Sequence, residues 1–174
     1  MKQFSKRLVA LHWLTFLLFV GAFYMGSTID GIEQPASKLA LYPYHFLGGI
    51  LVLLLTLARA WIRLRDGAPA PLVAGGALAM RVALLVHKFL YLLLILLPLS
   101  GLLMIFQTGV ASAVMANDPA RLPDLEKFAI HGVHGAIATV LLVTVGLHFV
   151  ASLFHQFVLK DGLLRRMAFK RYPD

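Results

Sequence analysis

Four long apolar runs constrain the fold of this chain more than any other feature. They lie at about residues 8–26, 44–62, 82–106 and 128–158. A helix needs about 20 apolar residues to cross a hydrocarbon core about 30 Å thick. No segment alternates apolar and polar residues as a barrel strand would. The sequence therefore predicts an all-α, integral membrane four-helix bundle, with residues 1–174 forming a single domain.

The distribution of Lys and Arg predicts the orientation of this bundle. Only three of the 16 basic residues lie between the first and second runs or between the third and fourth, namely Lys38, Arg121 and Lys127. The other 13 lie near the termini or near the segment between the second and third runs. Basic segments remain in the cytoplasm. We therefore expect a multi-pass membrane protein with both termini cytoplasmic.

Basic helix ends that meet anionic headgroups explain the net charge of +8. Membrane lipid, and not nucleic acid, is therefore the expected partner of these cations. Lys2, Lys6 and Arg7 precede the first run, as in a signal peptide. Because that run is long and no small-residue cleavage site ends it convincingly, we interpret it as a retained helix.

The three connections between the runs differ in their turn residues. Residues 26–43 contain Gly31, Pro35 and Pro43, which predict an irregular external cap. Residues 66–76 are rich in Gly and Pro and predict a flexible internal linker. Residues 108–127 form a longer external segment with a turn signal at residues 117–119.

Four histidines lie inside the apolar runs: His12, His45, His134 and His148. An imidazole at membrane depth is costly to desolvate, so each is a functional candidate. His134 and His148 are 14 residues apart, which in a helix is a separation of about 21 Å on nearly the same face. His45 and His12 belong to other runs, and each can face one of this pair at its own depth. The spacing predicts two stacked bis-imidazole sites.

Haem is the metal group that suits a site with only two imidazoles. Zinc requires four ligands, and the apolar runs contain almost no Asp or Glu. A porphyrin supplies four nitrogens, so the protein adds only two axial ligands. The chain has no cysteine, which excludes thiolate sites, iron–sulfur clusters and a covalently attached c-type haem. We expect two haem b groups; the alternatives are histidines bonded to one another and a haem-free membrane scaffold.

Several glycines adjoin these histidines in the sequence. They predict either a flat macrocycle packed against the backbone or close contact between helices. These glycines are Gly48, Gly49, Gly132, Gly135 and Gly146.

The combined pattern resembles the bacterial cytochrome b561 family over essentially the whole chain. It is also similar to the cytochrome b subunits that anchor periplasmic formate dehydrogenases and nickel hydrogenases, in which two b haems are stacked across the membrane. The matching residues are Leu11-His12-Trp13, His45, His87-x-x-x-Tyr91, Pro98, Gly101, His134, Gly146-Leu147-His148 and the segment from His155 to Met167.

The resemblance implies a specific pairing of the ligands, which the helix directions also favour. His45 and His134 are expected to bind the haem on the external side. His12 and His148 are expected to bind the haem on the cytoplasmic side.

The resemblance also suggests roles for the remaining histidines. Members of the family place a histidine beside ubiquinone at the position of His155, and the alternative is an interfacial histidine. His87 is expected to assist quinone binding, to contact a haem propionate, or to be a helix-end cation. His131 falls outside the recognised pattern and is expected to contact a propionate or solvent.

The free-standing branch of this family implies a superoxide oxidase, which transfers electrons from periplasmic superoxide to ubiquinone. His155 and Lys127 are then the residues expected to act on the two substrates, with Arg121 or His131 assisting Lys127 in attracting the anion. The internal linker lacks the lysine that the family offers to quinone, so Arg81 or Lys88 would replace it.

The alternative function is that of a membrane anchor. The chain would then receive electrons from a periplasmic dehydrogenase or another redox partner that docks on it. Both functions use the same haems and differ in the electron donor.

Overall fold

The computed structural model describes residues 3–67, 69 and 76–170. Every regular element within these residues is helical, which confirms the all-α prediction. Four segments are long and apolar enough to cross a membrane: α1 (Lys6–Gly31), α2 (Pro35–Asp66), α3 (Gly76–Thr108) and the segment Ala129–Leu159, which consists of α5 (Ala129–Phe154) and a π-helical turn, η3 (His155–Leu159).

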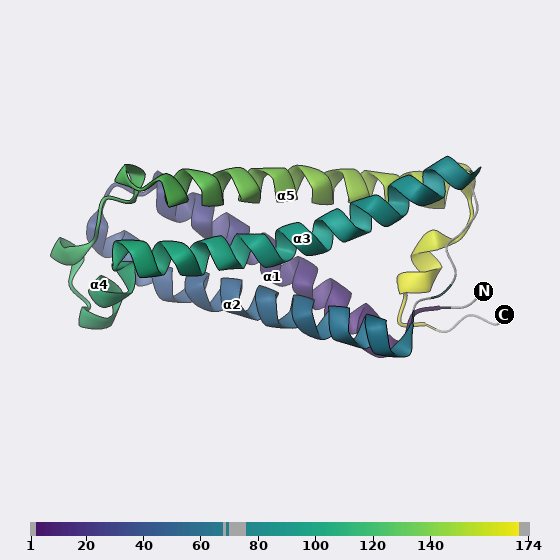
Figure 1. Cartoon of the computed structure of the whole chain (residues 1–174), viewed down its shortest axis with the longest axis horizontal. Helices are drawn as coiled ribbons and strands as arrows, with labels where there is room; N and C mark the ends of the chain where they lie inside the picture. The colour runs from purple at the N-terminus through teal and green to yellow at the C-terminus, as the bar shows by residue number, and fades with distance from the viewer. Residues whose placement is uncertain (1–2, 68, 70–75, 171–174) are drawn as a thin grey trace.

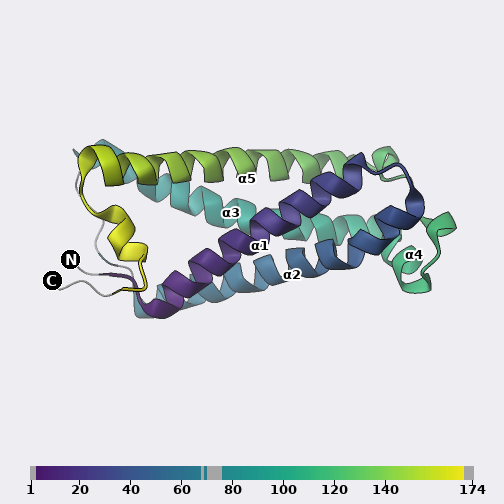
Figure 2. The same cartoon turned by 180° about the vertical axis from the view of Figure 1, so that it is seen from behind.

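The long helices form an elongated bundle (Figure 1). Helix α1 packs mainly on α2, α3 packs on α5, and α2 also contacts α3. Figure 2 shows the same bundle from behind, with both chain termini at one end. We call this end the terminal end, and the opposite end, which carries the short helix α4 (Val110–Ala116), the loop end.

The connection between α1 and α2 is much shorter than predicted. The prediction of an irregular cap over residues 26–43 is therefore wrong. Helix α1 continues to Gly31, and α2 begins at Pro35. Proline is well suited to the first turn of a helix, where its missing N–H has no intrahelical partner. Pro43 lies inside α2, and such prolines are tolerated in membrane helices where neighbouring groups satisfy the freed carbonyl.

The external segment at the loop end is more ordered than a simple loop. It contains α4 and two 3-10 turns, η1 (Pro119–Arg121) and η2 (Leu125–Lys127). The predicted turn signal is confirmed, because Asn117 ends α4 in the left-handed conformation and the Asp118 side chain caps η1. The predicted internal linker lies mostly outside the described residues, since only Gly67 and Pro69 are described between α2 and α3.

The buried core lies halfway along the bundle. This central cluster consists of Phe19, Val52, Leu93 and Leu141, one residue from each long helix; a second buried cluster, of Ile29, Tyr42 and Val110, lies nearer the loop end. Leu141 is seven residues from both His134 and His148. The core therefore separates two layers of histidines. Many large apolar side chains on the outside are exposed, such as Leu17, which is 64% accessible, as expected of a surface covered by lipid.

The C-terminal segment folds back across the terminal end. After η3, the chain forms a 3-10 turn, η4 (Leu163–Met167). The backbone N–H of Phe4 donates to Arg166 O at 3.2 Å, and Trp13 Nε1 donates to Met167 O at 3.1 Å. These bonds tie the C-terminal segment to the start of α1.

Candidate functional site

The loop-end histidine pair consists of His45 on α2 and His134 on α5. Their ring centres are 6.2 Å apart, and the planes are inclined at 80°. His45 Nδ1 lies 3.0 Å from Ala22 O, so this nitrogen donates to the carbonyl. The other ring nitrogen, Nε2, is then unprotonated and able to bind a metal.

His134 is oriented in the same way through a hydroxyl group. Its Nδ1 lies 2.8 Å from Ser100 Oγ, and the Ser100 hydroxyl donates to Leu97 O at 2.7 Å. Because the only hydroxyl proton is used on Leu97, His134 Nδ1 must donate to Ser100. His134 Nε2 is therefore also unprotonated and able to bind a metal. Such partners of the second ring nitrogen fix the orientation of a histidine ligand.

Two glycines create the space in which these rings lie. A Cβ atom on Gly26 would be 3.0 Å from Cε1 of His45, and one on Gly101 would be 3.2 Å from Cε1 of His134. Neither is a glycine that adjoins a histidine in the sequence. Among the glycines that do adjoin a histidine, a Cβ on Gly48 would lie 3.3 Å from Cβ of Ala22, between α1 and α2. A Cβ on Gly49, Gly132, Gly135 or Gly146 would meet no atom of the described residues within 4 Å.

The terminal-end histidine cluster consists of three residues. His12 on α1 and His148 on α5 have ring centres 6.4 Å apart. His87 on α3 lies closer to His148, at 5.2 Å, and its Nδ1 is 2.6 Å from Ala83 O. The sequence placed His12 opposite His148, and the structure adds His87 to the same layer.

The distance within each pair suits a metal bound between two imidazoles. Metal–imidazole bonds are about 2.1 Å, so two opposite ligands place their ring centres about 6 to 6.5 Å apart. The pairs His45–His134 and His12–His148 both fall in this range, at 6.2 and 6.4 Å. Two imidazoles per site are the axial ligands that a haem requires. The residues present therefore fit two haem groups, one in each layer.

His155 begins the π-helical turn at the terminal end. Its Nδ1 is 2.5 Å from Asp161 Oδ2, and Asp161 Oδ1 accepts a hydrogen bond from Leu163 N at 3.0 Å. Burial lowers the pKa of the nearby Arg166 guanidinium, whereas the Asp161 carboxylate raises it. The Asp161 carboxylate thus accepts hydrogen bonds through both of its oxygens, and it fixes the orientation of the His155 ring. Sequence reasoning missed Asp161, although its spacing of six residues from His155 is a visible signal.

An open cavity of about 510 Å³ lies beside this turn. The Gln156 Oε1 atom is buried and has no hydrogen-bond partner among the described residues, and Lys160 adopts a left-handed backbone conformation with φ 52°. Unsatisfied polar atoms and such conformations are common at functional sites. The cavity is lined by Gln156, Phe157, Lys160, Asp161, Gly162 and Arg165.

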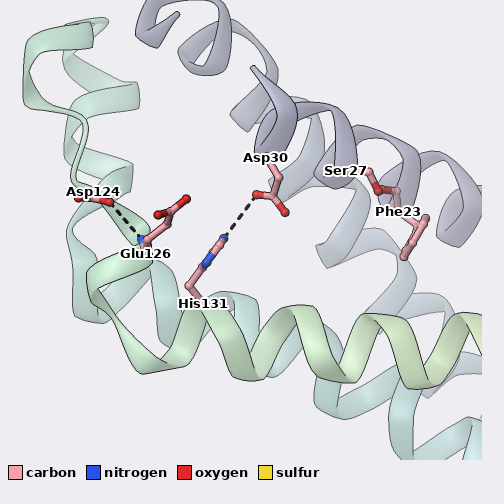
Figure 3. A network of polar contacts seen from close by, with 6 residues as sticks. All are labelled: Phe23, Ser27, Asp30, Asp124, Glu126 and His131. Carbon is pink, nitrogen blue, oxygen red and sulfur yellow. Dashed lines mark hydrogen bonds and ion pairs between the residues drawn. The ribbon is translucent and has the colours of Figure 1, made fainter. Parts of the chain in front are cut away.

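Two cations at the loop end, Lys127 and Arg121, lie next to carboxylates. Lys127 Nζ is 3.2 Å from Asp124 Oδ2, and Arg121 Nε is 3.1 Å from Asp118 Oδ2. Figure 3 shows His131 on α5 pointing toward Asp30 near the end of α1, at 3.4 Å. Lys127 is exposed, as an anion-attracting residue would be, but its charge is partly compensated.

Comparison with known proteins places this arrangement in a family. The family model described as prokaryotic cytochrome b561 matches residues 3–170. The chain belongs to the prokaryotic cytochrome b561 family. It is therefore a multi-pass membrane cytochrome that binds b-type haem and transfers electrons, as the resemblance in the sequence implied.

Several relatives match along nearly their whole length. The chain is 31% identical to cytochrome b561 homolog 1 of Escherichia coli, with 98% of this chain and 99% of the relative covered. It is 28% identical to the probable superoxide oxidase CybB of Yersinia pestis, with 98% of each chain covered. It is also 30% identical to cytochrome b562 of Cereibacter sphaeroides, with 94% of each chain covered.

Proposed function

We propose that this cytochrome carries electrons across the membrane through two haems, from an external donor to a quinone on the cytoplasmic side. The observation that carries the proposal is the presence of two imidazole pairs at separate levels of the bundle. His134 and His148 on α5 are 14 residues apart, which corresponds to about 21 Å along the helix. Two haems at these levels would divide the crossing into shorter electron-transfer steps.

In this proposal, His45 and His134 bind the external haem, and His12 and His148 bind the cytoplasmic one. The loop end then faces the periplasm of a bacterial inner membrane, and both termini lie in the cytoplasm. Each bound haem supplies one-electron redox chemistry at its iron. The protein contributes the axial imidazoles, their hydrogen-bonded orientation and an apolar environment that excludes water.

We propose ubiquinone as the electron acceptor and His155 as the residue that serves it. Reduction of a quinone to a quinol takes two electrons and two protons. The His155 ring, held by Asp161 at 2.5 Å, can pass a proton to a quinone oxygen and recover it from the cytoplasm. The adjacent cavity of about 510 Å³ offers space at the same end of the bundle.

We propose superoxide as the external donor. Two superoxide anions, one ubiquinone and two protons then give two molecules of dioxygen and one ubiquinol, so electrons and charges balance. The full-length match to a relative named probable superoxide oxidase supports this donor. The exposed Lys127 provides a positive charge at the external end.

Rapid mixing of superoxide with the oxidised, detergent-solubilised cytochrome tests this function. The haems should become reduced faster than superoxide dismutates, and added ubiquinone should reoxidise them. A visible spectrum and a haem-to-protein ratio of two should precede the kinetic test. If dithionite reduces both haems but superoxide reduces neither, superoxide is not the donor.

The charges at the loop end favour a second candidate, in which a cationic redox protein is the donor. Five acidic residues and three basic residues lie at this end, which gives a net charge of −2 when histidines are neutral: Asp30, Glu33, Asp118, Asp124 and Glu126 against Lys38, Arg121 and Lys127. A negative surface repels superoxide and attracts a positively charged partner. The chain would then be the membrane subunit of a larger electron-transfer complex.

The salt dependence of haem reduction separates the two candidates. The Debye length falls from about 10 Å at 0.1 M to about 3 Å at 1 M, so salt weakens whichever attraction guides the donor. Reduction by superoxide at Lys127 should slow as salt rises. An increase in that rate would mean that the net negative charge dominates, and co-purification with a basic redox protein would then favour the second candidate.

A further inference from the structure

Arg59 is a positively charged residue inside the bundle that the proposed electron path does not use. It lies on α2, 14 residues after His45, so it is about 21 Å nearer the terminal end on almost the same face of the helix. His45 faces the loop-end layer. Arg59 accordingly faces the terminal-end layer, where its charge acts on His12, His87 and His148.

Tyr91 on α3 lies beside Arg59. The guanidinium carbon of Arg59 is 5.4 Å from the centre of the Tyr91 ring. The Tyr91 hydroxyl is buried and has no hydrogen-bond partner within the described residues. A buried tyrosine hydroxyl usually donates to an acceptor. The described residues also contain no ion pair between Arg59 and a carboxylate.

These two side chains require the same kind of ligand. A guanidinium inside a membrane bundle is stable when it is paired with an anion. A phenol hydroxyl donates a strong hydrogen bond to an ionised oxygen. A carboxylate satisfies both groups at once, because one oxygen can accept from the guanidinium and the other from the hydroxyl.

We infer that Arg59 and Tyr91 form a carboxylate-binding site, whose ligand is a propionate of the haem bound in the terminal-end layer. The inference rests on the proposed function, because that haem is part of it. A b-type haem carries two propionates, and the site lies in the layer of His12 and His148. A fatty acid from the membrane offers the same carboxylate chemistry, so the test must distinguish the two sources.

The site has a consequence for the direction of electron flow. A reduced haem carries one more negative charge than an oxidised haem. A fixed cation beside it therefore favours the reduced form, and in a medium of low dielectric constant this effect is strong. Arg59 would make the cytoplasmic haem a better electron acceptor than it would be without that charge.

Redox titration of the two-haem protein tests the electrostatic part of the inference. In Arg59→Gln, the equilibrium constant for reduction of one haem should fall at least tenfold, which is a shift of about 59 mV for one electron. Arg59→Lys should recover part of the loss. The other haem should be unchanged. Arg65→Gln is the matched control, because Arg65 is exposed on the same helix.

Infrared spectroscopy tests the identity of the ligand. The protein is produced with haem labelled with ¹³C at its propionate carboxyl carbons, and redox difference spectra are compared with those of unlabelled protein. The labelled carboxylate bands should shift in Arg59→Gln and also in Tyr91→Phe, which removes only a hydroxyl and leaves the fold intact. Tyr44→Phe, at an exposed position, should leave them unchanged.

The outcomes are distinct from those of the proposed function. A wild-type protein without two haems contradicts the proposed function itself. Two normal haems whose potentials and labelled bands do not respond to Arg59→Gln or Tyr91→Phe overturn this inference alone. If the only carboxylate bands that respond to these substitutions are insensitive to the haem label, the ligand is a fatty acid. That result also overturns the inference.

Discussion

Gly26→Ala is a small change that tests whether the loop-end pair binds a haem. The added Cβ would lie 3.0 Å from Cε1 of His45, whereas carbon atoms in contact are normally about 3.5–4.0 Å apart. The His45 ring must therefore move by at least about 0.5 Å, and Cε1 is bonded to the Nε2 atom proposed to bind iron. Overpacking of this size costs about 1–3 kcal/mol.

That cost should appear as weaker binding of one haem. At 1.4 kcal/mol for each factor of ten, the expected loss of affinity is about 5-fold to 140-fold. The assay is haem transfer to an excess of a haem-accepting apoprotein, followed in the visible spectrum, with the remaining haem identified by its electron paramagnetic resonance signal. The external haem should leave faster, and the cytoplasmic haem should leave at the wild-type rate.

Gly21→Ala is the matched control for this variant. Gly21 lies on the same helix, and a Cβ there would meet no atom of the described residues within 4 Å. Replacing glycine by alanine inside a helix stabilises it by about 0.5–1 kcal/mol, so this control should bind both haems normally. If Gly26→Ala also keeps the wild-type rate of haem loss, the loop-end pair is not the haem site that we propose.

Three further predictions concern the ligands, the quinone and the donor. His134→Ala should remove the external haem and His148→Ala the cytoplasmic one, as counted by pyridine haemochrome; two full haems in both variants would contradict the assignment. His155→Ala should slow ubiquinone reduction by about 100-fold with an unchanged haem spectrum, and Asp161→Asn should slow it less, whereas loss of a haem would make His155 a ligand. Lys127→Gln should slow haem reduction by superoxide in stopped flow without changing quinone reduction; an equal rate would remove Lys127 from the encounter.

The sequence was sufficient to predict the four apolar helices and the two layers of histidines. Both depend on distances along one chain, because the helical rise converts 14 residues into about 21 Å. The juxtaposition of His45 with His134 follows from helix direction and depth. This pairing can be predicted without knowing any contact between side chains.

Contacts between helices could not be predicted in the same way. Gly26 lies against His45 from α1, and Gly101 lies against His134 from α3, so neither glycine is near its histidine in sequence. Pro35 and Pro43 predict an irregular cap when only the sequence is considered, whereas in the structure Pro35 starts α2 and Pro43 lies inside it. Which residues face each other across helices depends on rotation about each helix axis, which a single sequence does not define.

The terminal-end layer contains three imidazoles, and the distances between their ring centres favour His12 over His87 as the second ligand in our proposal. The axial ligands of a haem lie on opposite faces of the porphyrin, so their ring centres should be about 6 to 6.5 Å apart. His12 and His148 are 6.4 Å apart, whereas His87 is only 5.2 Å from His148. Iron does not fit between two opposed rings at the shorter distance, so His12 is the expected partner of His148.

Phenylalanine substitutions distinguish the two histidines, because the ring is kept while the metal-binding nitrogen is lost. His12→Phe should leave one haem per protein, with the remaining spectrum that of the external site. His87→Phe should retain two low-spin haems, because the ring centre of His87 is only 5.2 Å from that of His148, too close for the two rings to hold an iron between them. One haem in His87→Phe and two in His12→Phe would reverse the assignment and make α3, in place of α1, the source of the second ligand.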